Sequence, residues 1–360
     1  MKMKEFCEHL VLVTNPSRVF GIGSDKTAIK KNYLAIVRKI HPDIVESDEK
    51  IVASEATAHL NKLYKSACEQ IDKGTYGEEI ENISHKSTSS YTQENENFEN
   101  EEPIFKLNIK GKIVKIYNQI FEGKICDVYV GLLDDKKVFL KAGKIEESDE
   151  LLQNEYQILS RVKHRSLPSV LEMIKINCNL ALLENECVGQ PLSEILKKLN
   201  HGISQNHVMW ILERLLEVTG FLHSNMIVHG NIKPETIILD TKNHNASLVG
   251  LYFGCDKSVG VENYKVKNKI YSAPEISKLE EVNPRSDIFS IGKIAISLLN
   301  GNEISKVCPS STNRELANFI EKMAKQDSCS RPYDAFKLWD ELREVRTKIV
   351  GNKRFEEFVI

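Results

Sequence analysis

The chain has 360 residues, with 49 lysines and arginines against 51 aspartates and glutamates, so its formal net charge is −2. A chain of this length is expected to divide into one small domain and one of about 250 residues. The near-neutral charge provides no overall field that would attract nucleic acid or an anionic membrane, and we expect neither as a partner.

The cysteine pattern and the apolar runs limit the protein class further. The eight cysteines are scattered and form no Cys-x-x-Cys pair, which argues against a zinc site or a disulfide framework. No run of about 18 apolar residues is present, and the apolar run near the N-terminus is too short for a signal peptide. We therefore expect a soluble, cytoplasmic protein with reduced thiols and no bound metal.

Two amphipathic helical patterns come first in the chain. Apolar residues recur on one face of each pattern: Ile29, Tyr33, Ile36, Val37 and Ile40 in the first, and Val52, Ala56, Leu60, Leu63, Tyr64 and Ala67 in the second. Between them lies His41-Pro42-Asp43, where proline disfavours the helical conformation of the residue before it. The sequence predicts an all-α helical hairpin within residues 1–75.

The stretch FGIGSDKTAIKKNYLAIVRKIHPD, followed by HLNKLYKSA, resembles the J-domain of DnaJ-type co-chaperones over residues 15–72. The resemblance implies that the loop and the basic helix face bind a DnaK-type heat-shock chaperone and stimulate its ATPase. The implied contact residues are His41, Pro42, Asp43, Lys30, Lys31, Arg38 and Lys39. The alternative is a helix-ending turn with a capping aspartate beside an ordinary solvated face.

Residues 76–103 follow, with eight glutamates against one lysine and mostly Ser, Thr and Asn between them. Such a stretch cannot bury enough apolar surface to offset its ordering entropy, so we expect a flexible acidic linker. The predicted organisation is a J-domain at 1–75, the linker at 76–103, a second domain at 104–345 and a C-terminal tail at 346–360.

The second domain shows strand-like alternation first and long helical runs later. Segments 112–120, 127–133 and 137–143 alternate with β-branched residues, whereas 207–224 and 286–301 have helical period. This order, an α+β fold of a small sheet lobe before a larger helical lobe, is typical of a protein kinase. The motifs VFLK, NEYQIL, ALLENECVGQPL, VHGNIKPETIIL, YSAPE, SDIFSIG and SRP occur in kinase order, so residues 105–345 resemble that family.

The resemblance assigns roles residue by residue. Nucleotide contacts are implied at Gly123, Lys141, Glu155, Glu184 and Lys233, and fold-supporting roles at His229, Glu275, Asp287 and Arg331. Two of these have plainer alternatives that stay open: Lys141 with Glu155 as a structural ion pair, and Lys233 as an ordinary loop lysine. His229 is expected to be a core histidine bonded to backbone.

The chain departs from the kinase pattern where phosphoryl-transfer chemistry is performed. Asn231 replaces the aspartate base, Thr236 the asparagine that holds magnesium, and Gly250 the aspartate of Asp-Phe-Gly. An amide cannot take up a proton, and magnesium is bound through carboxylates. FEGKIC (121–126) keeps only the middle glycine of the phosphate-covering loop. We therefore expect a pseudokinase without catalytic residues, in which any ATP is held without tightly bound magnesium.

Together these features predict a J-domain co-chaperone whose kinase-fold domain binds a protein client or scaffold. Two alternatives remain at this point. One is an atypical Ser/Thr protein kinase brought to its target by the N-terminal domain, and the other is a nucleotide-sensing pseudokinase.

Overall fold

The computed structural model describes ten segments and six single residues of the chain. They are 16–20, 26–45, 49–73, 101–123, 125–176, 179–199, 202–256, 270–277, 282–300 and 304–351, with Cys7, Leu10, Val11, Tyr76, Phe98 and Phe358. Most of the predicted linker 76–103, and the segment 257–269 that precedes YSAPE, lie outside the described residues.

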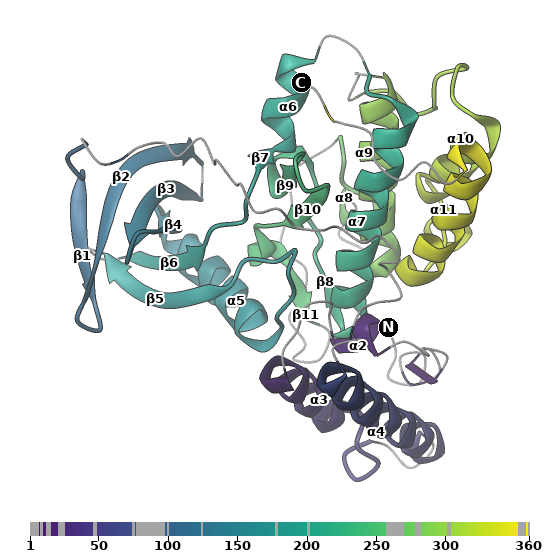
Figure 1. Cartoon of the computed structure of the whole chain (residues 1–360), viewed down its shortest axis with the longest axis horizontal. Helices are drawn as coiled ribbons and strands as arrows, with labels where there is room; N and C mark the ends of the chain where they lie inside the picture. The colour runs from purple at the N-terminus through teal and green to yellow at the C-terminus, as the bar shows by residue number, and fades with distance from the viewer. Residues whose placement is uncertain are drawn as a thin grey trace.

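A six-stranded antiparallel sheet and one helix form the small lobe, on the left of Figure 1. The sheet order is β1-β2-β3-β4-β6-β5, and helix α5 follows β4. The strands are β1 Phe105–Ile109, β2 Lys112–Glu122, β3 Cys126–Leu133, β4 Lys136–Gly143, β5 Val170–Ile176 and β6 Asn179–Asn185, and α5 is Glu146–Arg161. The alternating segments of the sequence are therefore strands, as predicted.

The strand register divides the sheet residues between two faces. Val138, Leu140 and Leu183 belong to an apolar cluster on one face, together with Val114 and Ile116. Successive strand residues point to opposite faces. Lys141, which pairs with Val128 on β3 and Leu182 on β6, therefore points to the other face, and so do Phe139 and its partners Val130 and Glu184. We call this second face the Lys141 face.

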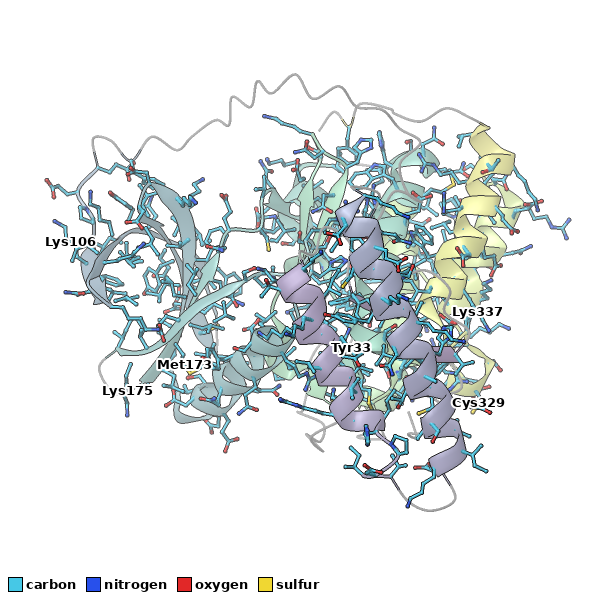
Figure 2. All side chains as sticks on the ribbon, turned by 60° about the horizontal axis from the view of Figure 1, so that its bottom comes forward. Tyr33, Lys106, Met173, Lys175, Cys329 and Lys337 are labelled. Atoms are coloured by element: carbon cyan, nitrogen blue, oxygen red, sulfur yellow. The ribbon has the colours of Figure 1, made fainter. Side chains whose placement is uncertain are left out.

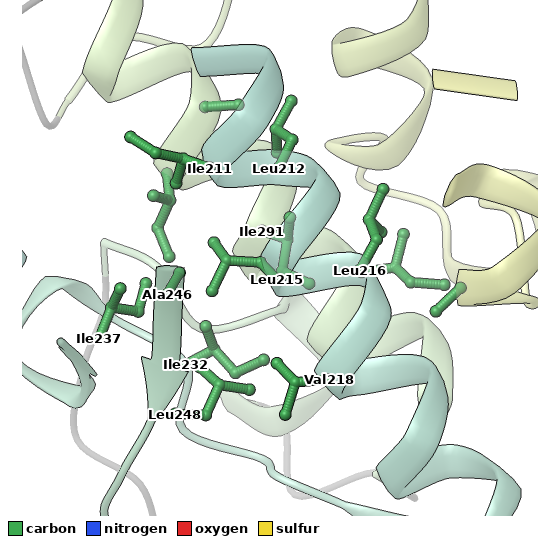
Figure 3. Close-up of a cluster of buried hydrophobic side chains, with 14 of the residues drawn as sticks. Ile211, Leu212, Leu215, Leu216, Val218, Ile232, Ile237, Ala246, Leu248 and Ile291 are labelled. Carbon is green, nitrogen blue, oxygen red and sulfur yellow. The ribbon is translucent and has the colours of Figure 1, made fainter. Parts of the chain in front are cut away.

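The large lobe is mainly helical and holds the largest apolar cluster. Buried side chains of α7, α9, β9, β10 and α11 pack there, as Figure 3 shows for Leu215, Ile237, Leu248 and Ile291. The elements are β7 Gln190–Pro191, α6 Leu192–Lys198, α7 Gln205–Ser224, β8 Ile227–Val228, η3 Pro234–Thr236, β9 Ile237–Asp240, β10 Asn245–Leu248, η4 Leu251–Phe253, β11 Cys255–Asp256, α8 Pro274–Ser277, α9 Pro284–Asn300, α10 Arg314–Met323, η5 Ser328–Ser330 and α11 Ala335–Val350.

Helix α7 shows how the sequence builds this core. Ser204 caps its N-terminus by accepting a hydrogen bond from the amide of His207. Nearly every α7 residue after Asn206 is buried, because β10, α9 and α11 contact the helix on different sides. A helix that is apolar on all sides is stable only when it is enclosed in this way.

The N-terminal helices lie beneath both lobes in Figure 1. They are α2 Ser17–Phe20, α3 Lys26–Ile40 and α4 Lys50–Asp72. Helices α3 and α4 lie side by side, and Tyr33, labelled in Figure 2, stacks on Tyr64 with 4.3 Å between ring centroids. Ile29, Ile36 and Leu60 are buried in their shared cluster. The hairpin predicted from periodicity is therefore present.

The hairpin packs directly on the large lobe. Met226, in the connection between α7 and β8, is buried in the same apolar cluster as α3 and α4. It holds a φ of 62°, which side-chain-bearing residues rarely adopt. Contacts between α2 and α7 add to this interface.

Phe358, the one residue described beyond Gly351, packs in the apolar cluster of the large lobe. Phe358 is 8% exposed and lies 4.6 Å from the His207 ring, centroid to centroid. The indole Nε1 of Trp210 donates to His207 Nδ1 at 3.2 Å in the same group.

Among the described helices, none is long and apolar enough to span a membrane. The described cysteines are all free thiols.

Candidate functional site

The centre of the Lys141 face is a buried group of one ammonium and two carboxylates. The Nζ atom of Lys141 lies 2.8 Å from Glu155 Oε1 on α5 and 2.9 Å from Glu184 Oε2 on β6. All three side chains are less than a tenth exposed. The predicted contacts Lys141, Glu155 and Glu184 are thus brought together, and both carboxylates face the same ammonium.

Burial and the neighbouring charges shift the pKa values of Lys141 and Glu184. Burial raises the pKa of Glu184 to about 7, although the charge of Lys141 opposes the change. Burial alone lowers the pKa of Lys141, but the charges of Glu155 and Glu184 outweigh it and raise that pKa. The single ammonium is thus already accompanied by two acidic groups, which disfavours a further anion at the same site.

An aromatic ring stands beside this group where the kinase motif has a small residue. VFLK (138–141) places Phe139 at the position of alanine in the motif V-A-I-K. Phe139 shares the Lys141 face and packs near Val130 and Tyr117. The phenylalanine is visible in the sequence when all four residues of VFLK are compared with V-A-I-K, but it was not among the predicted site residues.

The loop that would cover phosphates is short and internally bonded. The amide of Gly123 donates to Asp127 Oδ1 at 3.2 Å, and Lys144 pairs with the same carboxylate at 3.1 Å. A Cβ on Gly123 would lie 2.8 Å from the Phe121 ring and 2.4 Å from the carbonyl of Cys126. The Gly123 amide is therefore already used within the chain, where a phosphate-binding loop would direct its amides at the ligand.

The loop with VHGNIKPETIIL is held together by its own polar groups. Thr236 Oγ1 accepts from the Lys233 amide and lies within hydrogen-bond distance of the Asn231 carbonyl, both at 3.0 Å. His229 Nδ1 accepts from the Asn231 amide at 3.3 Å, and Nε2 donates to the carbonyl of Val249 at 3.2 Å. Burial lowers the pKa of His229, so this ring is a neutral element of the loop. Lys233 is half-buried.

Gly250 lies directly against this loop. Its φ is 76°, and a Cβ there would lie 3.2 Å from Thr236 Cγ2 and 3.4 Å from the Tyr252 ring. Tyr252 itself occupies the glycine position of Asp-Phe-Gly, and burial raises the pKa of its hydroxyl. The amide of Leu251 donates to Glu155 Oε1 at 2.8 Å. The segment therefore joins α5 to the large lobe without presenting a carboxylate.

Asp287 and the pair of Glu275 with Arg331 form the polar support below the loop. The carboxylate of Asp287 accepts from the amides of His229 and Gly230, both at 2.8 Å. Arg331 NH1 donates to Glu275 Oε1 at 2.9 Å. Burial raises the pKa of Glu275, but its hydrogen bonds to Arg331, Ser286 and the backbone, together with the charge of Arg331, outweigh burial and lower that pKa. These groups hold backbone segments in place.

The residues predicted to contact a chaperone fall into two sets. The exposed set is at and around the turn after α3, where the amide of Asp43 donates to His41 Nδ1 at 3.3 Å. It comprises His41, Pro42, Asp43, Lys30 and Arg38, of which His41 and Pro42 are partly covered. Lys31, which is also exposed, and half-buried Lys39 both contact this chain.

The two lysines bond carbonyl oxygens of both lobes. The ammonium of Lys31 donates to the Ser160 carbonyl near the end of α5, and that of Lys39 to the Asn225 carbonyl at 3.4 Å. Burial, together with the charge of Arg161, lowers the pKa of Lys39 to about 7. Of the predicted chaperone-binding face, Lys39 is thus partly covered by this molecule, whereas Lys31 bonds it and stays exposed.

Comparison with known proteins identifies the larger part of the chain. The family model described as "Protein kinase domain" matches residues 114–353. Serine/threonine-protein kinase ATG1c of Arabidopsis thaliana is 31% identical over 165 residues, covering 44% of this chain and 21% of the relative. Serine/threonine-protein kinase ATG1b of the same plant is 26% identical over 227 residues, covering 60% and 30%.

A third relative gives the same result from another organism. The probable serine/threonine-protein kinase fhkC of Dictyostelium discoideum is 28% identical over 226 residues, covering 61% of this chain and 35% of the relative. The chain thus spans no more than 35% of the length of these three relatives.

These findings overturn the expectation of a J-domain co-chaperone acting on a DnaK-type chaperone. The matching family model and the relatives are those of protein kinases, and nothing in them supports a J-domain at 1–75. The helices were predicted correctly, but a short motif at the turn misassigned them, because a proline-ended helix followed by aspartate is also an ordinary turn. With a kinase model matching residues 114–353 and relatives that agree with it, the chain belongs to the protein kinase family.

Proposed function

We propose that this chain is a pseudokinase of the Ser/Thr protein kinase branch, a protein that keeps the kinase fold without transferring phosphate. The observation that carries the proposal is the second carboxylate on Lys141, since Glu184 Oε2 lies 2.9 Å from Nζ in addition to Glu155. Protein kinases as a family bind ATP and usually magnesium, and the residues at this site do not fit that pair of ligands.

The lack of fit for magnesium rests on donor chemistry. Magnesium needs hard oxygen ligands, and in kinases the Asp of Asp-Phe-Gly and the Asn of the catalytic loop supply them. Gly250 has no side chain, and the Thr236 hydroxyl is hydrogen-bonded to the Lys233 amide at 3.0 Å. Asn231 has no lone pair that accepts a proton at neutral pH, so general-base help of typically ~10²–10⁴-fold is missing.

The lack of fit for a nucleotide rests on charge and space. A phosphate that bonds Lys141 must displace a carboxylate or lie beside two of them, and like charges in a buried site repel strongly. Phe139 further fills the position that the motif V-A-I-K leaves to alanine. Any ATP bound here is held weakly and without tightly bound magnesium.

A weakly active atypical Ser/Thr kinase is the second candidate. It is favoured by the intact bond between Lys141 and Glu155 and by the Asp287 bonds that shape the loop. The three relatives described above, which are named as serine/threonine-protein kinases, agree with it. The same experiment separates the two candidates.

The test compares the full chain with Lys141→Ala in a phosphate-transfer assay with radiolabelled ATP and either magnesium or manganese. We expect no transfer above the Lys141→Ala background with either metal. Transfer that is lost in Lys141→Ala would establish the active kinase and refute the pseudokinase.

A thermal-shift titration gives a second, independent reading. A ligand that binds only the native state raises its apparent stability. We expect ATP to give the same small or absent shift with magnesium as with EDTA. A shift that requires magnesium would contradict the proposal. Glu184→Leu serves as the matched variant, because removing one carboxylate from Lys141 should increase the metal-independent shift.

A further inference from the structure

Phe98, from the acidic stretch 76–103, lies on the small lobe. Its ring stacks on Tyr117 of β2, with 4.5 Å between centroids and 24° between planes. Only 6% of Phe98 is exposed, and its carbonyl accepts from the amide of Glu101 at 3.2 Å. A segment rich in glutamate therefore buries one aromatic side chain against the sheet.

The surface under Phe98 is built by three strands. Phe98, Tyr117 and Val130 form one buried cluster, against which Leu132 and Phe139 pack. The register places Val130 and Leu132 of β3, and Phe139 of β4, on the Lys141 face. Tyr117 lies next to Ile116, which belongs to the opposite cluster, at a shift in the pairing of β2 with β3. We call the surface of Tyr117, Val130, Leu132 and Phe139 the Phe98 slot.

We propose that the Phe98 slot is a docking site for an aromatic side chain in a short acidic segment, and that Phe98 of this chain occupies it in cis. An aromatic ring gains from buried area and from ring–ring contact, which favours Phe98 over the polar and acidic residues around it. A tethered segment also acts at an effective concentration in the ~millimolar range, so modest intrinsic affinity is enough for docking.

The slot selects a flat apolar group. Its walls are the rings of Tyr117 and Phe139 and the branched side chain of Val130. The proposal does not depend on whether the chain transfers phosphate, since the slot is defined by packing and the proposed function by the Lys141 group. It does place an occupant of this chain next to Phe139 on the face that kinases offer to a nucleotide.

The experiment uses a fluorescent peptide with the sequence of residues 94–103 and the full chain. We expect the peptide to bind the Phe98→Ala chain at least ~10-fold more tightly than wild type, because in wild type the tethered copy competes for the slot. A peptide with alanine in place of phenylalanine should bind neither chain. Equal binding to both chains, or no binding to Phe98→Ala, would overturn the proposal.

Variants of Tyr117 distinguish a slot from a general change in folding. In the Phe98→Ala background, Tyr117→Phe keeps the ring and should preserve peptide binding, whereas Tyr117→Ala should lower it by at least ~10-fold. Cooperative thermal unfolding of each variant verifies that it is folded. If Tyr117→Phe and Tyr117→Ala behave alike, the ring stack does not hold the segment. Phosphate transfer by wild type would refute the proposed function and leave these outcomes unchanged.

Discussion

Asp287 and Lys141 are both charged side chains in buried, polar surroundings, but they bond different kinds of groups. Asp287 accepts from the backbone amides of His229 and Gly230, with His223 Nε2 also 2.9 Å away, and so fixes the shape of a loop. Lys141 bonds two side chains, Glu155 and Glu184. The first group acts on the backbone of its own chain, and the second lies where a kinase meets its ligand.

This difference shows which kinase residues a fold can lose. Removing a partner from a buried charge leaves that charge uncompensated, so groups that support backbone are costly to change. Side chains that face only a ligand do not support the backbone, so they can change where no ligand has to bind. Gly250 and Thr236 illustrate this, because they now pack against each other or bond the local backbone.

The largest expected effect is a loss of stability when the buried pair of Glu275 and Arg331 is broken. Arg331→Met should destabilise the protein by about 3–5 kcal/mol, because Glu275 would remain buried without its charged partner. The pKa of Glu275 is lowered in the folded protein, so the pair contributes above the ordinary value of 4.5 and its contribution is lost as pH falls through the lowered pKa. Denaturant unfolding of both proteins at neutral and acid pH measures both effects.

An exposed ion pair provides the matched control for this change. Lys348 and Glu315 are 3.3 Å apart with more than half of each side chain exposed. Lys348→Met should therefore change stability by no more than about 1 kcal/mol. If Arg331→Met costs as little, the region around Asp287 and Glu275 does not carry the fold.

A smaller effect is expected beside Lys141, in the pH dependence of stability that Glu184 causes. Burial raises the pKa of Glu184 to about 7, so between its ordinary value of 4.5 and about 7 the folded state binds more protons than the unfolded state. Stability should then fall as pH rises through this window, by an amount on the order of 1–3 kcal/mol. Glu184→Gln should remove that slope, as measured by thermal or denaturant unfolding across the window.

The control for this slope is a glutamate of the exposed surface. Glu194 pairs with exposed Lys197 in α6, and Glu194→Gln should leave the slope of wild type unchanged. An identical slope in wild type and Glu184→Gln would mean that Glu184 remains ionised throughout, held by Lys141.

The smallest expected effect tests whether the N-terminal hairpin belongs to the supporting scaffold. Burial lowers the pKa of Lys39 to about 7, against an ordinary 10.5, so between these values the unfolded state binds more protons and docking should strengthen as pH rises. Lys39→Met should remove this dependence and stabilise the hairpin near neutrality by about 1 kcal/mol. Hydrogen exchange of α3 and α4 amides measures it.

Lys30, on the exposed side of α3, gives the matched variant. Lys30→Met should leave both the exchange rates and their pH dependence close to those of wild type, since the residue is exposed. Protection of α3 that is independent of pH in wild type would show that Lys39 stays charged at the interface.

The elements and many site residues could be predicted from local patterns. The spacing of Ile29, Ile36 and Ile40 predicted α3, and the motif order predicted the two lobes, because periodicity and motifs depend on neighbours in sequence. The pairing of Lys141 with Glu155 followed from the motif, but its second bond to Glu184 did not. That bond depends on the register of β4 with β6, which no local pattern specifies.

The same limit explains the error at the N-terminus. A basic helix face looks available in sequence, but Lys31 and Lys39 bond carbonyl oxygens of Ser160 and Asn225, more than a hundred residues away. Phe98 was likewise assigned to a linker by the composition around it, although one aromatic residue in an acidic segment is enough to fill a slot.

By itself the sequence determined the helices of the hairpin, the order of the kinase lobes and the loss of carboxylates at 231 and 250, since each is a property of residue identity and short spacing. Only the tertiary structure decided that Lys141 has two carboxylate partners, that Phe98 covers the neighbouring slot and that the hairpin rests on α5 and α7. These contacts join residues distant in the chain, and their strength depends on burial, which is acquired only when the chain folds.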